Sequence, residues 1–197
     1  MQGLADGYFV LPYTIGKYLS QDIRTPPIKT DHEAFISAEK NARKRNQRLL
    51  DNKGSRSVES FHRELGKIVW DYCGMSRSKE GLRKAIQDIG TLRNDFWDNV
   101  NVPGRDNVLN PELAKAGRVA DFFELGELMM RDALERDESC GGHFREEHQT
   151  DEGEALRDDE GFTFTSAWEH RGRDVPPTLN KEELIFDTVH PTQRSYK

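Results

Sequence analysis

The sequence predicts a mainly α-helical fold: an antiparallel bundle of three to four long helices with a small C-terminal β-hairpin appendage. Apolar residues recur at three- and four-residue steps over four stretches between positions 31 and 136, the period of a helix with one buried face. Short loops with glycine or proline separate these stretches, so consecutive helices should be antiparallel neighbours. After position 149 the pattern changes to an acidic loop and short apolar runs.

Composition sets the limits of this fold. The chain has 197 residues, 35% hydrophobic and 32% charged, which suits one domain, or one domain plus an appendage, with a large surface. A net charge of −6 argues against general nucleic-acid binding. We find no apolar run of about 18 residues that would span a membrane and no signal-peptide pattern. Cys73 and Cys140 are expected to be reduced thiols.

The first segment, residues 1–19, is apolar nearly all round and carries three glycines and Pro12. A helix of this kind must be buried on most sides, and Pro12 should kink or end it. We therefore expect its packing partners to lie in polypeptide upstream of Met1. The following Pro26-Pro27 pair predicts an extended linker.

Four helices are expected next. Their predicted ranges are Asp31–Leu50, Val58–Cys73, Lys79–Asp98 and Pro111–Arg136. The first should bury Phe35, Ala38, Ala42 and Leu49. Ser78 and Asn110 are suitable N-caps for the third and fourth helices, and Pro111 suits a first helical position.

The C-terminal part predicts less regular structure. Residues 151–161 should form a loop, and 162–165 a strand that Trp168 extends. Pro176-Pro177 should break the chain, and residues 184–186 form a second apolar run. These two runs are expected to pair as the hairpin, and residues 190–197 to form a polar tail.

Residues 137–148 hold the densest set of chemically capable side chains. Cys140, His143, Glu146, Glu147 and His148 do not match a familiar zinc spacing, so we predict no metal site. Cys140 and His143 as a nucleophilic pair would need a base held in reach and an oxyanion site, which the sequence does not specify. We therefore predict no catalytic residue. No glycine-rich phosphate loop follows a strand, and the basic run at residues 40–48 fits a solvated helix face.

Several segments nevertheless resemble one family. Residues 1–16 are similar to the end of the flavin-binding domain of succinate dehydrogenase/fumarate reductase flavoprotein subunits. Residues 137–147 resemble that family's Glu-Ser-Arg-Gly-x-His-x-Arg segment, although the family more often has Arg at Cys140 and often Ala at Gly142. Residues 116–125, 157–159, 168–169 and 192–197 fit the same domain in order. The family's His-Gly-Ala-Asn-Arg-Leu-Gly segment is absent and is expected just upstream of Met1.

The resemblance implies that the chain is a C-terminal fragment of a larger subunit. Residues 1–22 would be the tail of the flavin-binding domain, 23–30 a linker, 31–149 the helical domain, and 150–197 a loop, hairpin and tail. Met1 and Gln2 would lie at the edge of the flavin site. Five loop residues would hold the domain interface: Glu138, Ser139, Cys140, His143 and Arg145.

The activity implied for the whole subunit is hydride transfer between succinate or fumarate and bound FAD, with the isolated chain binding no flavin. Electrons would pass to an iron–sulfur subunit and, through a membrane anchor subunit, to quinone. The subunit would then lie on the cytoplasmic face of the membrane. The alternative is a free-standing helical interaction or assembly module without catalysis, and no nucleic-acid partner is expected.

Overall fold

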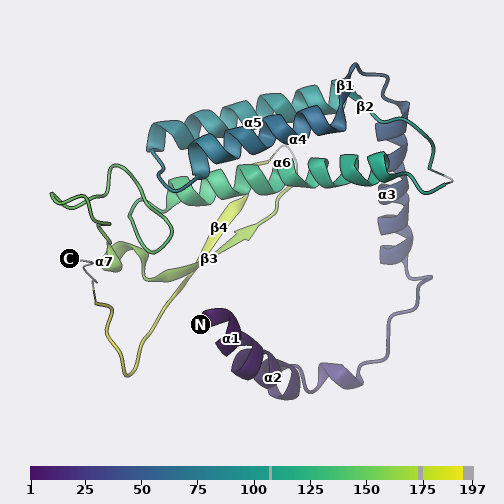
Figure 1. Cartoon of the computed structure of the whole chain (residues 1–197). Coiled ribbons are helices and arrows are strands. Elements are labelled where there is room, and N and C mark those ends of the chain that lie inside the picture. The colour runs from purple at the N-terminus through teal and green to yellow at the C-terminus, as the bar shows by residue number, and fades with distance from the viewer. Residues whose placement is uncertain (107, 173–174, 193–197) are drawn as a thin grey trace. The chain divides into compact units, whose positions relative to one another are not determined.

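The structure, a computed structural model, describes residues 1–106, 108–172 and 175–192 (Figure 1). The chain divides into two compact units, residues 1–45 and residues 46–197. Residues 193–197 of the expected polar tail, including most of the segment that resembles the family's C-terminus, lie outside the described residues. In the described part of the chain, no helix is long and apolar enough to cross a membrane.

The first unit begins with a helical stretch that mixes α and π turns. It consists of α1 (Gln2–Ala5), η1 (Asp6–Val10), α2 (Leu11–Tyr13) and η2 (Thr14–Tyr18), followed after a turn by η3 (Asp22–Arg24). Pro12 was expected to kink or end the helix, and the helical turns continue past it. It lies in the first positions of α2, and the π turn before it closes with a bond from Leu11 N–H to the Asp6 carbonyl. The wider turn accommodates a residue that lacks an N–H.

Apolar side chains of this stretch lie in solvent. Among the described side chains of residues 1–24, none is buried. Tyr8 and Phe9 are each 74% exposed and Tyr18 is 80% exposed. The first unit therefore does not cover its own apolar surface.

Helix α3 (Glu33–Asp51) runs from the first unit into the second. Its expected apolar face is only partly correct, because Phe35 is half exposed and Leu49 is the one buried residue of the helix. Leu49 joins the core of the second unit, and the Arg48 guanidinium lies 4.5 Å from the centre of the Trp97 ring.

The second unit is built on three packed helices: α4 (Val58–Cys73), α5 (Lys79–Asn99) and α6 (Pro111–Glu135) (Figure 1). Each helix begins at a side-chain cap. The side chains of Ser57, Ser78 and Asn110 accept hydrogen bonds from the N–H groups three residues later. The core between the helices contains stacked aromatic rings, with Phe96 5.3 Å from Phe61 and 5.4 Å from Phe123.

A short parallel pair closes one end of the bundle. Strand β1 (Arg56–Ser57), just before α4, pairs with β2 (Val100–Asn101), just after α5. The start of α4 is thereby tied to the end of α5.

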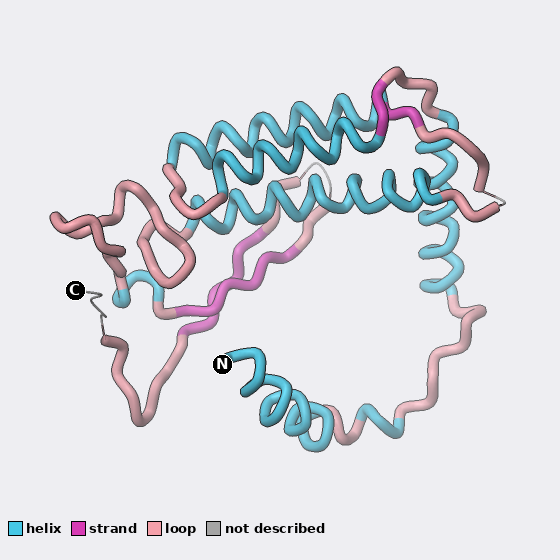
Figure 2. Tube along the Cα trace, in the orientation of Figure 1, coloured by secondary structure: helices cyan, strands magenta, loops and turns pink. Residues whose placement is uncertain are grey.

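The hairpin follows the short helix α7 (Asp159–Phe162) and consists of β3 (Phe164–Glu169) and β4 (Thr178–Glu183), paired antiparallel (Figure 2). Trp168 extends the first strand as expected. The second strand differs from the expectation: it starts directly after Pro176-Pro177, and residues 184–186 follow it as an exposed segment. Trp168 Nε1 donates to Asp132 Oδ1 at 2.7 Å, and Lys181 Nζ lies 3.2 Å from Glu135 Oε1, so the hairpin is anchored on α6.

Candidate functional site

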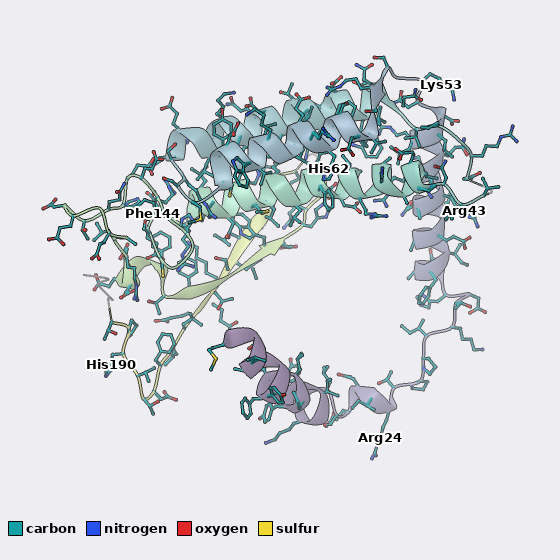
Figure 3. All side chains as sticks on the ribbon, viewed as in Figure 1. Arg24, Arg43, Lys53, His62, Phe144 and His190 are labelled. Atoms are coloured by element: carbon teal, nitrogen blue, oxygen red, sulfur yellow. The ribbon has the colours of Figure 1, made fainter. Side chains whose placement is uncertain are left out.

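The loop of residues 137–148 follows α6 and pairs with the connection between α4 and α5. Arg77 N–H donates to the Phe144 carbonyl at 3.0 Å, and Glu146 N–H donates to the Arg77 carbonyl at 2.8 Å. Phe144 is labelled in Figure 3. These bonds join segments about seventy residues apart in sequence and fix the loop at the end of the bundle opposite the β1–β2 pair.

Within the loop, residues 140–143 form a tight turn. Cys140 N–H donates to the His143 carbonyl at 2.8 Å, and His143 N–H donates to the Cys140 carbonyl at 3.0 Å. Gly141 has φ +60°, a conformation that favours glycine, whereas Gly142 has no such requirement. Both glycines are exposed, so the turn presents bare backbone to its surroundings.

Arg145 is fully buried and caps the C-terminus of α6. Its Nη1 donates to the Ala133 carbonyl at 3.0 Å, with the carbonyls of Leu134 and Arg136 each at 3.4 Å. A cation at this position also interacts favourably with the helix dipole. The predicted site residue is therefore a structural centre of the second unit.

The Arg145 guanidinium is balanced by two carboxylates. Its Nε donates to Glu147 Oε2 at 3.1 Å, and its Nη2 lies 3.0 Å from Asp137 Oδ1 as an ion pair without hydrogen-bond geometry. Hydrogen bonding to His148, together with the Arg145 charge, holds the pKa of Asp137 below its usual value. Partial burial opposes ionisation of Glu147, but the Lys79 N–H at 2.6 Å and other donors outweigh it and lower the pKa of that carboxyl.

Ser139 and Glu138 are also buried and connect the loop to later residues. Ser139 Oγ accepts from Arg145 N–H at 2.7 Å, and Ser139 N–H donates to the Leu156 carbonyl at 2.9 Å. Glu138 accepts from Arg136 Nε and from Asp158 N–H, each at 2.8 Å. Three of the five predicted interface residues thus lie in one buried network.

His143 is held as a neutral imidazole of defined tautomer. Its Nε2 lies 2.7 Å from the Arg136 carbonyl, which only accepts, and its Nδ1 lies 2.8 Å from Arg77 Nη1, which only donates. The proton is therefore on Nε2. Burial is the main cause that lowers the pKa of His143, and the nearby Arg77 charge adds to it.

This geometry decides the chemistry of the Cys140–His143 pair. Both ring nitrogens of His143 are engaged by Arg136 and Arg77, so the imidazole has no free lone pair with which to deprotonate the Cys140 thiol. In the described residues, no group of three or more His, Cys, Asp or Glu side chains is placed to hold a metal ion.

Two predicted residues lie outside this loop, and two of its contact residues were not predicted. Met1 is fully exposed and Gln2 starts α1, but the Gln2 side chain lies outside the described set. Arg77 and Asp158 are site partners that the sequence reasoning missed. Both act through contacts distant in sequence. No local pattern signals Arg77, and Asp158 lies in the segment 157–159, which resembles the family but was not assigned to the site.

A sequence profile of the fumarate reductase flavoprotein C-terminal region matches residues 62–196, more than half of the chain. The chain belongs to this family. The resemblance expected from its segments is thereby confirmed. The relatives include the fumarate reductase flavoprotein subunit of Escherichia coli, 28% identical over 167 residues, which are 84% of this chain and 27% of that protein.

Further relatives show the breadth of the flavoprotein family. An uncharacterized FAD-dependent oxidoreductase of Methanocaldococcus jannaschii is 31% identical over 118 residues, covering 57% of this chain and 20% of that protein. The L-aspartate oxidase of Yersinia pestis is 30% identical over 100 residues, covering 48% and 17%. The chain thus spans about a quarter or less of the length of these relatives.

Solved structures share the fold. The quinol fumarate reductase of E. coli superposes with a TM-score of 0.72 at 24% identity, covering 90% of this chain and 29% of that chain. The Mycobacterium smegmatis Sdh1 complex superposes with a TM-score of 0.67 at 22% identity, covering 85% and 27%. The expected mainly α-helical bundle with a C-terminal hairpin is confirmed.

Proposed function

We propose that this chain is the C-terminal helical part of a flavoprotein subunit that interconverts succinate and fumarate by hydride transfer to or from FAD. The family membership and relatives named as fumarate reductase flavoprotein subunits support this proposal. In the whole enzyme, electrons would pass to an iron–sulfur subunit and then to quinone at a membrane anchor. The flavoprotein would be peripheral to the cytoplasmic face of that membrane.

We infer that FAD is held mainly by residues outside this chain. A dinucleotide needs a glycine-rich turn between a strand of a parallel sheet and a helix. The described strands form two two-stranded pairs, and the glycines of residues 1–16 lie in helical turns. Flavin binding would therefore come from the upstream flavin-binding domain, with Met1 and Gln2 at its edge.

The part played by this chain is then structural. The observation that carries this role is the Arg145 network, which joins the end of α6, the α4–α5 connection and residues 156–158. We infer that this network makes the loop rigid and that its exposed turn at Gly141-Gly142 meets the flavin domain. Cys140, half-buried at the base of the turn, would contribute to the same interface.

The test uses the full-length subunit with its partners. Arg145→Met and His143→Gln should lower flavin content and assembly, because both changes loosen the loop. Arg63→Met is the matched control, since the only ion pair of Arg63 within the described residues is an exposed one with Glu59 on α4. Variants that keep full flavin content and assembly but lose turnover would make the loop catalytic and contradict the structural role.

A second measurement tests the source of flavin binding. FAD added to the purified chain should leave its visible spectrum unchanged, whereas the full-length subunit should retain flavin through gel filtration. A shifted flavin spectrum with the 197-residue chain would contradict the assignment of flavin binding to the upstream domain.

The substrate is tested separately, because an L-aspartate oxidase is among the relatives. The full-length subunit should reduce its flavin with succinate and not with L-aspartate. Flavin reduction by L-aspartate alone would replace the proposed reaction with amino-acid oxidation while leaving the structural role of the loop intact.

A further inference from the structure

A cavity of about 310 Å³ lies between α5, α6 and the β3–β4 hairpin, apart from the loop of residues 137–148. Its lining is mostly apolar and includes Leu125, Leu128, Trp168, Val175 and Pro177. The volume suits a small organic molecule at the lower end of the usual range for ligand sites.

One wall of this cavity is charged. Glu127 accepts from Arg93 Nη1 at 2.7 Å and from Arg131 Nε and Nη2 at 2.9 and 2.7 Å. The Glu127 and Arg93 side chains have little contact with water, at 16% and 18% exposed, and the Arg131 side chain is 31% exposed. A single carboxylate thus serves two guanidinium groups at a sheltered position.

The two guanidinium groups of this wall have more N–H donors than Glu127 can accept from. Each guanidinium has five N–H groups, and Glu127 is the only hydrogen-bond acceptor that Arg93 and Arg131 contact in the described chain. Two further carboxylates are close, Glu124 in the lining and Asp132 in contact with Trp168, and both are exposed, so water weakens their fields. Among the described residues, the three least exposed charged side chains of the wall, Arg93, Glu127 and Arg131, therefore carry one excess positive charge and have unused N–H donors.

The apolar wall opposite is fixed in place. Trp168 Nε1 donates to Asp132 Oδ1 at 2.7 Å, which holds the indole ring of the hairpin against α6. An indole anchored by its N–H presents a large rigid surface for an apolar group.

We propose that this cavity binds a small monocarboxylate with an apolar tail. The carboxylate would accept hydrogen bonds from the unused N–H groups of Arg93 and Arg131, a geometry that guanidinium favours. The tail would lie against Leu128, Trp168 and Pro177. This site uses no residue of the flavin interface, so it extends beyond the proposed function and does not depend on it.

The probe is 3-phenylpropionate titrated into the full chain, with the Trp168 indole ¹H–¹⁵N resonance as the readout. A dissociation constant on the order of 1 mM is expected for a ligand of about eleven heavy atoms. Trp168→Phe assigns the resonance. The matched ligands are 3-phenylpropionamide, which lacks the charge, and acetate, which lacks the tail. Both should bind at least tenfold more weakly.

Variants test the charged wall. Arg131→Gln should weaken 3-phenylpropionate binding about tenfold, the loss of one charge-assisted contact, and Arg93→Gln should act in the same direction. Arg118→Gln, at an exposed position of the same helix, should have no effect. Circular dichroism confirms that each variant is folded. Should Arg131→Gln disturb the fold, the ligand comparison on the unaltered chain still decides the proposal.

Three results would overturn it. An indole resonance that does not move with 3-phenylpropionate excludes the site. Equal binding of the amide removes the role of the guanidinium groups. Tighter binding of an aspartate-containing peptide than of any small carboxylate would make the wall a docking point for a protein partner instead.

Discussion

Arg145 concentrates more stabilising contacts than any other side chain of the loop, and its own side chain is fully buried, although its two carboxylate partners are partly exposed. It supplies hydrogen bonds to carbonyls at the end of α6 and charge to two carboxylates. Removing one partner of a buried ionic network leaves the others unpaired, which costs more than the network itself contributes.

We therefore predict that Arg145→Met lowers the free energy of unfolding by about 3 kcal/mol. Arg145→Lys should recover part of this loss, because it keeps the charge but not the planar set of donors. Chemical denaturation followed by circular dichroism measures both. The exposed Arg63→Met change should cost less than about 0.5 kcal/mol, and an equal effect of the two methionine variants would refute the buried role.

The two glycines of the turn should respond differently to the same change. Gly141→Ala places a side chain at φ +60° and should destabilise the chain by about 1 kcal/mol. Gly142→Ala should be nearly neutral, since a Cβ there meets no heavy atom within 4 Å. Equal denaturation midpoints for the two variants would show that the turn adopts another conformation.

His143 should make stability depend on pH. Its pKa in the folded chain lies below the unfolded value of 6.5, so the unfolded state binds more protons as the pH falls below that value. Stability should be constant above about pH 7.5 and decrease as the pH falls from there through the unfolded value. His143→Gln should flatten the curve between about pH 5.5 and 7, where the carboxylates of Asp137 and Glu147 are almost fully ionised in the folded and the unfolded chain.

The control for this pH effect is His190→Gln, at an exposed position near the end of the described chain (Figure 3). Denaturation midpoints across the pH range should follow the unaltered chain in that variant. A slope that survives in His143→Gln would assign the pH effect to another group.

At the scale of elements, the helices could be predicted from local signals. Ser78 and Asn110 cap the helices that the sequence assigned to them, and the bounds of α4 match the expected range. The burial of α3 could not be predicted. The spacing of its apolar residues indicates a helix, but it does not show whether another part of the chain covers those residues. The second strand was predicted too late in the sequence, at residues 184–186. The residues of β4 are mostly polar, so its pairing with β3, and not an apolar pattern, defines the strand.

Two glycines outside the loop, Gly66 in α4 and Gly54 before β1, should respond in opposite ways to substitution by alanine. Gly66 lies in the interior of α4, exposed, and an added Cβ meets nothing within 4 Å. Gly66→Ala should raise the free energy of unfolding by about 0.5–1 kcal/mol through helix propensity. Gly54→Ala is the opposite case, because its Cβ would lie 1.8 Å from the Asn99 carbonyl oxygen, and it should be strongly destabilising.

Thermal unfolding of both variants tests this contrast. A lower midpoint for Gly66→Ala would mean that the exposed face of α4 is covered in solution. No loss in Gly54→Ala would show that the segment before β1 moves freely away from α5.

At the scale of the whole molecule, the sequence identified the loop of residues 137–148 as important but not how it acts. Its key contacts link residues 20 to about 70 positions apart, such as Glu138 with Asp158 and Glu146 with Arg77. A single sequence holds no local pattern for such pairs. The apolar character of residues 1–19, in contrast, can be read from the sequence, but the burial expected for them is not provided by this chain, since none of their described side chains is buried.

This exposed apolar surface should cause self-association. We predict that the purified chain binds a hydrophobic dye and forms concentration-dependent oligomers, and that removal of residues 1–30 abolishes both. Analytical ultracentrifugation measures the association. The control is Leu109→Ser, an apolar residue of the second unit that is 95% exposed. Persistent association after the deletion would place the adhesive surface in the second unit.

The parallel pairing of β1 with β2 has a consequence for how the second unit opens. At one end this pair ties α4 to α5, and at the other end the turn between the same helices is held by residues 144–146. Neither helix has a loose terminus from which melting can spread. The two helices should therefore exchange their slowest amide protons in a single concerted event, together with the loop that clamps them.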